Sequence, residues 1–298
     1  LASIHFGLDE NNKPYIHLND YEPFNSKFDS VWTELEKATE LGITVILMVG
    51  GAGGAFNDLF SNYKTYYPLL KELIEKKGNI IKGIDLDIEE EVDIEDVKML
   101  INNINKDFGN EFIITMAPIQ SSLEHDEPGM GGFIYKDLYE SEEGKLISYF
   151  NTQFYFDYSK TGYDEIVKNG YPPEKVVMGM ITNSNMDNDY IELQKTFQKY
   201  HPNLGGVFIW EYYDAPDDWL DTIIPKASDT SNNPFVNTPT RSPEERGIID
   251  VDKMNQDYFM PKSIKEQINF EERANDFGVP DIFLDREFNI EAGKIVFE

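Results

Sequence analysis

Short apolar segments alternate with segments that repeat apolar residues every three or four positions over most of the chain. The first kind predicts β-strands and the second predicts amphipathic helices. Seven strands are expected, at Ser3–Leu8, Thr44–Val49, Ile80–Ile88, Phe112–Ala117, Phe150–Phe156, Lys175–Ile181 and Gly205–Trp210.

The clearest helix is expected between the first two strands, where six apolar residues share one face and Gly42 ends the pattern. Further helices are expected at Tyr66–Lys77, Val92–Phe108, Tyr163–Asn169, Asp189–Lys199 and Asp217–Ile224. Several strands are apolar on both faces, which is typical of parallel strands covered by helices. Repeated units of this kind form either an open doubly wound sheet or a closed barrel, and the pattern alone does not choose between them.

The composition changes after Lys226. Residues 1–226 predict one α/β domain, and residues 227–246, rich in Ser, Thr, Asn and Pro, predict a linker or a long surface excursion. Residues 247–298 form an acidic extension to which no role is assigned. Within it we expect a helix near Ser263–Asn275 and a strand pair near Asp281–Phe297.

The formal net charge of −29 disfavours nucleic acids and anionic membrane surfaces as partners, whereas a neutral or cationic partner is compatible with it. No apolar run is long enough to cross a bilayer. The absence of cysteine excludes disulfides, thiolate metal sites and cysteine nucleophiles. The chain opens directly on a strand with no visible signal peptide, so we expect a processed or excised piece whose cellular location the sequence leaves unknown.

The segment Gly83–Glu90 carries the most informative pattern in the chain. Side chains alternate between the two faces of a strand, so Asp85, Asp87 and Glu89 share one face and the aliphatic residues between them share the other. Each unpaired buried carboxylate costs several kcal/mol or takes up a proton. This carboxyl ladder therefore indicates function, at the end of a strand where barrel enzymes build their sites.

Three other interpretations of this segment are weighed. A solvated face of an antiparallel sheet conflicts with neighbouring strands that are apolar on both sides. A calcium loop requires glycine at its sixth position and polar residues between the ligands. A carboxylate site for a divalent metal is harder to exclude, although no histidine lies nearby in sequence. Glu90, Glu91 and Asp93 are expected to form a solvated loop.

With Glu89 at its end, this segment resembles the signature of glycoside hydrolase family 18, the chitinases and endo-β-N-acetylglucosaminidases. That signature is Asp-x-x-Asp-x-Asp-x-Glu on the fourth barrel strand, and here Lys82 replaces the first Asp. Phe156 is a second departure, where Asn or Asp is common. Further segments agree with the family's third, fifth, sixth (hevamine-like) and eighth strands, namely Leu47–Gly51, Thr115–Pro118, Asn151–Tyr155 and Gly205–Trp210.

The resemblance implies a (β/α)8 barrel of the TIM type. In this alignment Ser3–Gly7 matches the family's second strand, so the first strand is missing. Either the chain begins after that strand, or Gly293–Phe297 supplies the eighth strand of a permuted barrel.

The resemblance also implies retaining, substrate-assisted hydrolysis of β-1,4 bonds in N-acetylglucosamine glycans, in which the substrate's acetamido oxygen attacks the anomeric carbon. Glu89 would then be the general acid and base. Asp87 would orient the acetamido N–H, Asp85 would share a proton with Asp87, and Tyr155 would hydrogen-bond the acetamido carbonyl. Adjacent carboxylates raise one another's pKa, which suits an acid that works near neutral pH.

The remaining site residues follow from the same resemblance. Trp210 would form the floor beneath the sugar, Gln153 and Met116 would line the pocket, and Gly51 belongs to a tight turn that admits substrate. No metal or cofactor is implied, and a secreted or extracellular location is favoured. The alternatives are an endo-β-N-acetylglucosaminidase acting on glycoprotein or peptidoglycan glycans, a non-catalytic glycan-binding relative, and a metal-dependent barrel enzyme.

Overall fold

The computed structural model describes residues 1–19, 21–155, 158–182, 186–200, 202–211, 215, 288–291 and 294–297, with only the backbone described at 186–190 and in the last two ranges. Phe156, the segment 227–246 and the expected helices at Asp217–Ile224 and Ser263–Asn275 lie outside the described residues.

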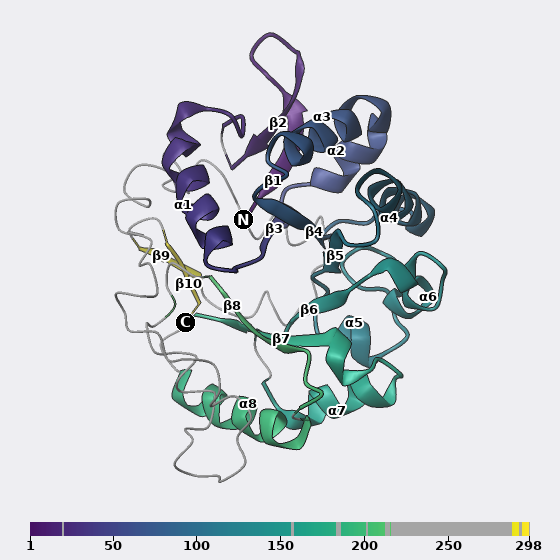
Figure 1. Cartoon of the computed structure of the whole chain (residues 1–298). Coiled ribbons are helices and arrows are strands. Elements are labelled where there is room, and N and C mark those ends of the chain that lie inside the picture. The colour runs from purple at the N-terminus through teal and green to yellow at the C-terminus, as the bar shows by residue number, and fades with distance from the viewer. Residues whose placement is uncertain are drawn as a thin grey trace.

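One eight-stranded sheet forms the centre of the domain (Figure 1), in the order β2-β1-β3-β4-β5-β6-β7-β8. The strands are β1 (Ile4–Leu8), β2 (Pro14–Leu18), β3 (Val45–Gly50), β4 (Ile81–Asp87), β5 (Ile113–Met116), β6 (Tyr149–Gln153), β7 (Val176–Ile181) and β8 (Gly206–Trp210). All seven predicted strands are confirmed, and each pairs in parallel with its neighbour. The sequence pattern missed β2, which returns antiparallel along β1 as a hairpin.

Helices lie along the outer side of the curved sheet (Figure 1). They are α1 (Asp29–Glu40), α2 (Ala55–Ser61), α3 (Tyr63–Lys76), α4 (Ile94–Phe108), α5 (Ser121–Glu124), α6 (Tyr135–Tyr139), α7 (Lys160–Lys168) and α8 (Met186–Tyr200), with 3-10 turns at Ser26–Phe28, Gly144–Leu146 and Pro173–Lys175. α4 begins where the Asp93 carboxylate accepts a hydrogen bond from the Glu95 N–H, and it ends at Gly109. Among the described helices, none is long and apolar enough to span a membrane.

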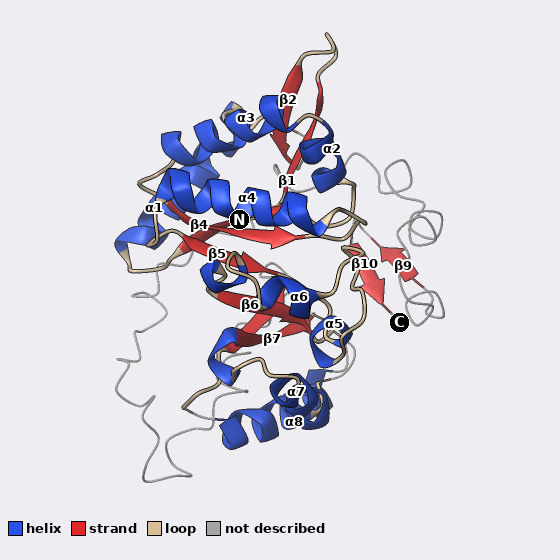
Figure 2. Ribbon diagram, turned by 90° about the vertical axis from the view of Figure 1, so that its right-hand side faces the viewer, coloured by secondary structure: helices blue, strands red, loops and turns tan. Residues whose placement is uncertain are grey.

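The sheet does not close into a barrel in the described part of the chain. β2 and β8 are its two edges, which fits a TIM-type barrel that lacks its first strand. The predicted strand pair near the C-terminus is confirmed as β9 (Phe288–Glu291) and β10 (Lys294–Phe297), which pair with each other in a separate sheet (Figure 2). The permutation that would insert Gly293–Phe297 into the barrel is therefore wrong.

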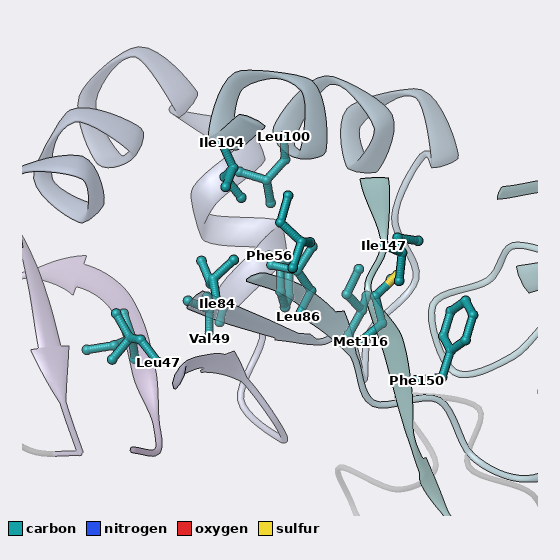
Figure 3. Close-up of a cluster of buried hydrophobic side chains, with 14 of the residues drawn as sticks. Leu47, Val49, Phe56, Ile84, Leu86, Leu100, Ile104, Met116, Ile147 and Phe150 are labelled. Atoms are coloured by element: carbon teal, nitrogen blue, oxygen red, sulfur yellow. The ribbon is translucent and has the colours of Figure 1, made fainter. Parts of the chain in front are cut away.

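The main core fills the space between the sheet and the outer helices. Ile84 and Leu86 of β4 point toward Leu100 and Ile104 of α4, and all four side chains are completely buried (Figure 3). Burying a side chain of this size stabilises the fold by about 1.5–3 kcal/mol. β4 lies between two parallel strands, β3 and β5, so the alternative of a solvated antiparallel sheet is wrong.

Candidate active site

The aliphatic residues of β4 take the helix side of the sheet, so its carboxyls take the other side. Asp85 and Asp87 are 7% and 6% exposed, and Glu89 lies half-buried just beyond the end of the strand. Strand register sets Asp85 beside Thr115 of β5 and Asp87 beside Gly50 of β3. The parallel arrangement therefore gathers the ladder at the carboxyl end of the sheet.

Asp85 is the deepest carboxyl of the ladder and is held by two neighbouring strands. The Thr115 hydroxyl and the Asn151 side-chain amide both donate to its Oδ1, the latter over 3.0 Å. Burial raises the pKa of Asp85, and these two hydrogen bonds oppose the rise because they favour the ionised form. Asp85 is thus fixed in place by residues of β5 and β6.

A single amide connects the two outer carboxyls. Gln153 Nε2, at the end of β6, lies 3.2 Å from Asp87 Oδ1, 3.5 Å from Glu89 Oε1 and 2.9 Å from the Ala117 carbonyl oxygen. One NH₂ group cannot donate fully to three acceptors, so its hydrogens are shared among them. Gln153 therefore holds Asp87 and Glu89 in one arrangement.

Burial and mutual repulsion favour protonated carboxyls in this ladder. The pKa of Asp87 is raised well above its usual range, first by burial and then by the negative charges of Glu89, Asp85 and Glu90. Burial also raises the pKa of Glu89, and the hydrogen bond from Gln153 opposes that rise. Because the carboxyls interact, their protons belong to the group as a whole. A proton retained near neutral pH is what a general acid requires.

Tyr155 follows β6 and faces the same ladder. Burial raises the pKa of its hydroxyl well above 10, and the charges of Asp87, Glu89 and Asp85 raise it further. The ring meets Phe208 of β8 edge to face, with centroids 6.5 Å apart. Tyr155 therefore keeps its hydroxyl proton to higher pH than an exposed tyrosine does, and it can donate a hydrogen bond.

Gly51 and Trp210 lie at the same end of the sheet. The Gly51 N–H donates to the Asp87 carbonyl oxygen over 2.8 Å, so the turn after β3 is attached to the ladder. Trp210 is the last residue of β8 and is 37% exposed, as expected for a ring that borders open space.

Met116 lies elsewhere. On β5 its neighbour Thr115 points toward Asp85, so the Met116 side chain points to the opposite face. It is fully buried near Ile147 in the apolar core (Figure 3). The pocket-lining role expected for Met116 is therefore dropped, because strand alternation turns its side chain toward the helices.

A scan against protein-family models and a search of curated proteins found no match. Solved structures, in contrast, match well. A fungal endo-β-N-acetylglucosaminidase from glycosyl hydrolase family 18 is 29% identical, with a TM-score of 0.64 over 73% of this chain and 82% of its own. Chitinase ChiC from Aspergillus fumigatus is also 29% identical, with a TM-score of 0.65 over 79% of this chain and 84% of its own. The chain is therefore similar to glycoside hydrolases of family 18.

A more distant match shares the fold. The spore cortex-lytic enzyme SleL from Bacillus cereus is 11% identical, with a TM-score of 0.52 over 74% of this chain and 66% of its own. The two matches at 29% identity are both glycosidases, which supports the prediction that this chain is an enzyme.

The departure at Lys82 from the family 18 signature does not reach the ladder. Lys82 is exposed near the start of β4, and its Nζ donates to the Gly78 carbonyl oxygen over 2.6 Å. It shares the strand face of Ile84 and Leu86, opposite to the carboxyls. The substitution thus leaves the hydrogen bonds of the three carboxyls in place.

The sequence pattern missed several residues around the ladder. Thr115 and Asn151 hold Asp85, and the fully buried Tyr135 of α6 is influenced by the charges of all three carboxyls. Asn151 could have been found, because it lies two residues before Gln153 and therefore shares its strand face. Tyr135 gave no such signal because a loop brings it to the site.

The structure corrects one expectation: Glu90 was expected in a solvated loop, but the residue is 1% exposed. Its Oε1 accepts hydrogen bonds from the backbone N–H groups of Phe56 and, over 3.3 Å, of Asn57. From the sequence alone, a charged residue just after a strand is expected at the surface. In the folded structure the start of α2 covers Glu90.

Proposed function

We propose that this chain hydrolyses β-1,4 bonds in glycans that contain N-acetylglucosamine, with retention of configuration and with help from the substrate's own acetamide. The observation that carries the proposal is the Gln153 amide, which lies between Asp87 and Glu89 at the carboxyl end of the sheet. The Tyr155 hydroxyl, whose pKa responds to both carboxyls, supports it. The two glycosidases at 29% identity support the same substrate class.

In this proposal protonated Glu89 gives its proton to the glycosidic oxygen as the bond to the anomeric carbon breaks. The acetamido oxygen of the substrate attacks that carbon and forms a cyclic intermediate. Asp87 accepts the acetamido N–H, and Tyr155 donates to the acetamido oxygen to align it. Water then opens the intermediate after ionised Glu89 takes its proton, which regenerates the acid.

The supporting groups act through binding. Asp85 would exchange a proton with Asp87 as the charge on the sugar ring of the substrate changes during the reaction. The exposed Trp210 would lie beneath the sugar, since a flat apolar surface suits the C–H face of a pyranose. The turn at Gly51 would form the wall beside Asp87. An extracellular location belongs to the same proposal.

A second candidate lies within the same class of reaction. An endo-β-N-acetylglucosaminidase would cleave inside a glycoprotein or peptidoglycan glycan rather than a chitin chain. The family 18 endo-β-N-acetylglucosaminidase that matches at 29% identity favours this candidate as much as the chitinase favours the first. Parallel assays on chitin oligosaccharides and on an N-linked glycopeptide separate the two.

The decisive experiment compares the native chain with Glu89→Gln, with hydrolysis and binding of a chitin oligosaccharide measured for both. We expect the native chain to cleave and the variant to bind without cleaving. Glu91→Gln is the matched control, because it removes one acidic charge two residues away at an exposed position.

If neither protein cleaves any of these substrates while both bind, the chain is a glycan-binding protein and the hydrolase proposal fails. The described residues contain no group of three or more acidic or histidine side chains placed to hold a metal ion. Activity that is lost on adding a chelator, and restored by a divalent metal, would favour the metal-dependent alternative.

A further inference from the structure

Glu90 is a buried carboxyl that the proposed mechanism does not use. It follows Glu89 directly, but the alternation of the chain turns it to the opposite side, toward α2. Its Oε1 accepts from the N–H groups of Phe56 and Asn57, and its buried Oε2 has no hydrogen-bond partner among the described residues. The next residue, Glu91, is exposed.

The two N–H groups that Glu90 binds belong to the start of α2, directly after the Gly50–Gly54 turn that borders the active site. The other end of this turn is attached to Asp87: the Gly51 N–H donates to the Asp87 carbonyl oxygen over 2.8 Å. At Gly50 a Cβ atom would lie 2.1 Å from the same carbonyl oxygen, so the backbones are in close contact. The turn is thus held to the end of β4 at both ends, by Asp87 and by Glu90.

The charge of Glu90 affects the pKa values of the neighbouring carboxyls. Glu89 and Asp87 lie on the side of β4, and the two N–H groups of α2 lie on the other side. Burial raises the pKa of Asp58, the acidic residue of α2, and the charge of His17 in the hairpin opposes that rise. No Lys or Arg forms an ion pair with Glu90 in the described part of the chain. Burial raises the pKa of Glu90 to about 7, and the charge of Glu89 adds to this, against the hydrogen bonds from Phe56 and Asn57.

We infer that Glu90 is a positioning residue, which fastens the Gly50–Gly54 turn to the end of β4 and adds a further titrating carboxyl to the active site. The catalytic part of this inference rests on the proposed function. When Glu90 is ionised, its charge makes the Asp87–Glu89 pair hold its proton to higher pH. When Glu90 is neutral, that support is absent.

Kinetics of the 298-residue chain test the inference with three variants. Glu90→Gln keeps an acceptor for the Phe56 N–H but cannot ionise, so the alkaline limb of the kcat/KM profile should move down by ~0.5 pH unit. Glu90→Ala removes the acceptor, so KM should rise ~5-fold or more while Glu90→Gln stays near the native KM. Glu91→Gln should leave both the profile and KM unchanged.

A measurement without substrate separates this inference from the proposed function. The folded pKa of Glu90, about 7, lies above the ordinary value of 4.5, so its ionisation destabilises the fold. The contribution is absent below pH 4.5 and grows as pH rises through 7. The melting temperature of Glu90→Gln minus that of the native chain should therefore increase by ~5 °C between pH 5 and pH 8. The same difference for Glu91→Gln should not change with pH.

The hydrolase proposal and the inference about Glu90 can be refuted independently of each other. An inactive native chain whose Glu90→Gln variant shows the melting difference overturns the hydrolase proposal and keeps the titrating, turn-fastening Glu90. An active chain whose Glu90→Gln variant matches it in both the pH profile and the melting series overturns the inference. A pH-independent loss of stability that is equal in Glu90→Ala and Glu90→Gln also overturns it, because Glu90→Gln keeps the hydrogen-bond acceptor that Glu90→Ala lacks and removes the titrating charge.

Discussion

The side-chain amide of Asn151 lies 3.0 Å from Oδ1 of Asp85, a residue 66 positions earlier in the chain. The two residues belong to β6 and β4, which are separated in the sheet by β5. The hydrogen bond therefore spans the inner side of the curved sheet. It favours the ionised form of Asp85 and so opposes the rise in pKa that burial causes.

Replacing Asn151 by Ala should make the stability of the fold more dependent on pH. The folded pKa of Asp85 is raised above its unfolded value, so its ionisation already destabilises the fold as pH increases. Without Asn151 that pKa rises further, and the variant should lose about 1–2 kcal/mol at pH 8 and distinctly less at pH 4.5. Urea unfolding at the two pH values measures the difference.

The control for this prediction is Asn110→Ala, which removes an exposed asparagine beyond the end of α4. Its effect should be small and equal at both pH values. An Asn151→Ala loss that is the same at pH 4.5 and pH 8 would show that the bond acts on packing and not on the charge of Asp85.

Replacing Gln153 by Ala should weaken catalysis and move the pH profile upward. The Gln153 hydrogen bond lowers the pKa of Glu89, so its loss raises that pKa and the alkaline limb of kcat/KM shifts to higher pH. The loss of alignment between Asp87 and Glu89 should reduce kcat ~10–100-fold. Rates from pH 4 to pH 9 test both expectations.

Gln198→Ala, at an exposed position of α8, is the matched control and should leave the profile unchanged. The shift expected for Gln153→Ala is opposite in direction to that expected for Glu90→Gln. An alkaline limb that moves downward in Gln153→Ala would contradict the assignment of Glu89 as the acid that Gln153 supports.

Two glycines with similar backbone angles should respond very differently to a methyl group. Gly50 has φ +98° and its Cβ would overlap the Asp87 carbonyl oxygen, whereas Gly42 has φ +84° and no atom within 4 Å of its Cβ. Gly42→Ala should lower the free energy of unfolding by about 1 kcal/mol, because only the positive φ disfavours alanine there. Gly50→Ala should cost several times as much, because backbone at the site must move.

Thermal melts of the two variants provide this comparison, and hydrolysis by Gly50→Ala adds a second reading because Asp87 itself would shift. Equal melting temperatures for the two variants would mean that the turn after β3 can relax away from Asp87 without cost.

The sequence by itself determined the seven parallel strands, the longer helices and the carboxyl ladder. These features depend on local periodicity: two-residue alternation separates Asp85 and Asp87 from Ile84 and Leu86, whatever the rest of the chain does. The sequence pattern did not predict the hairpin strand β2, because its polar residues, such as His17, interrupt the apolar pattern. The roles of Glu89 and Tyr155 stay predictions until the variants are measured.

Only the tertiary structure decided which residues surround the ladder and which do not. Met116 was assigned to the pocket by its position in a motif, but the alternation set by Thr115 turns it into the core. Glu90 was assigned to solvent by its neighbours in sequence, but α2, which begins 35 residues earlier at Ala55, covers it. Burial is a property of surfaces that distant segments bring together, so the environment and pKa of a carboxyl are fixed by the fold and not by the residues beside it.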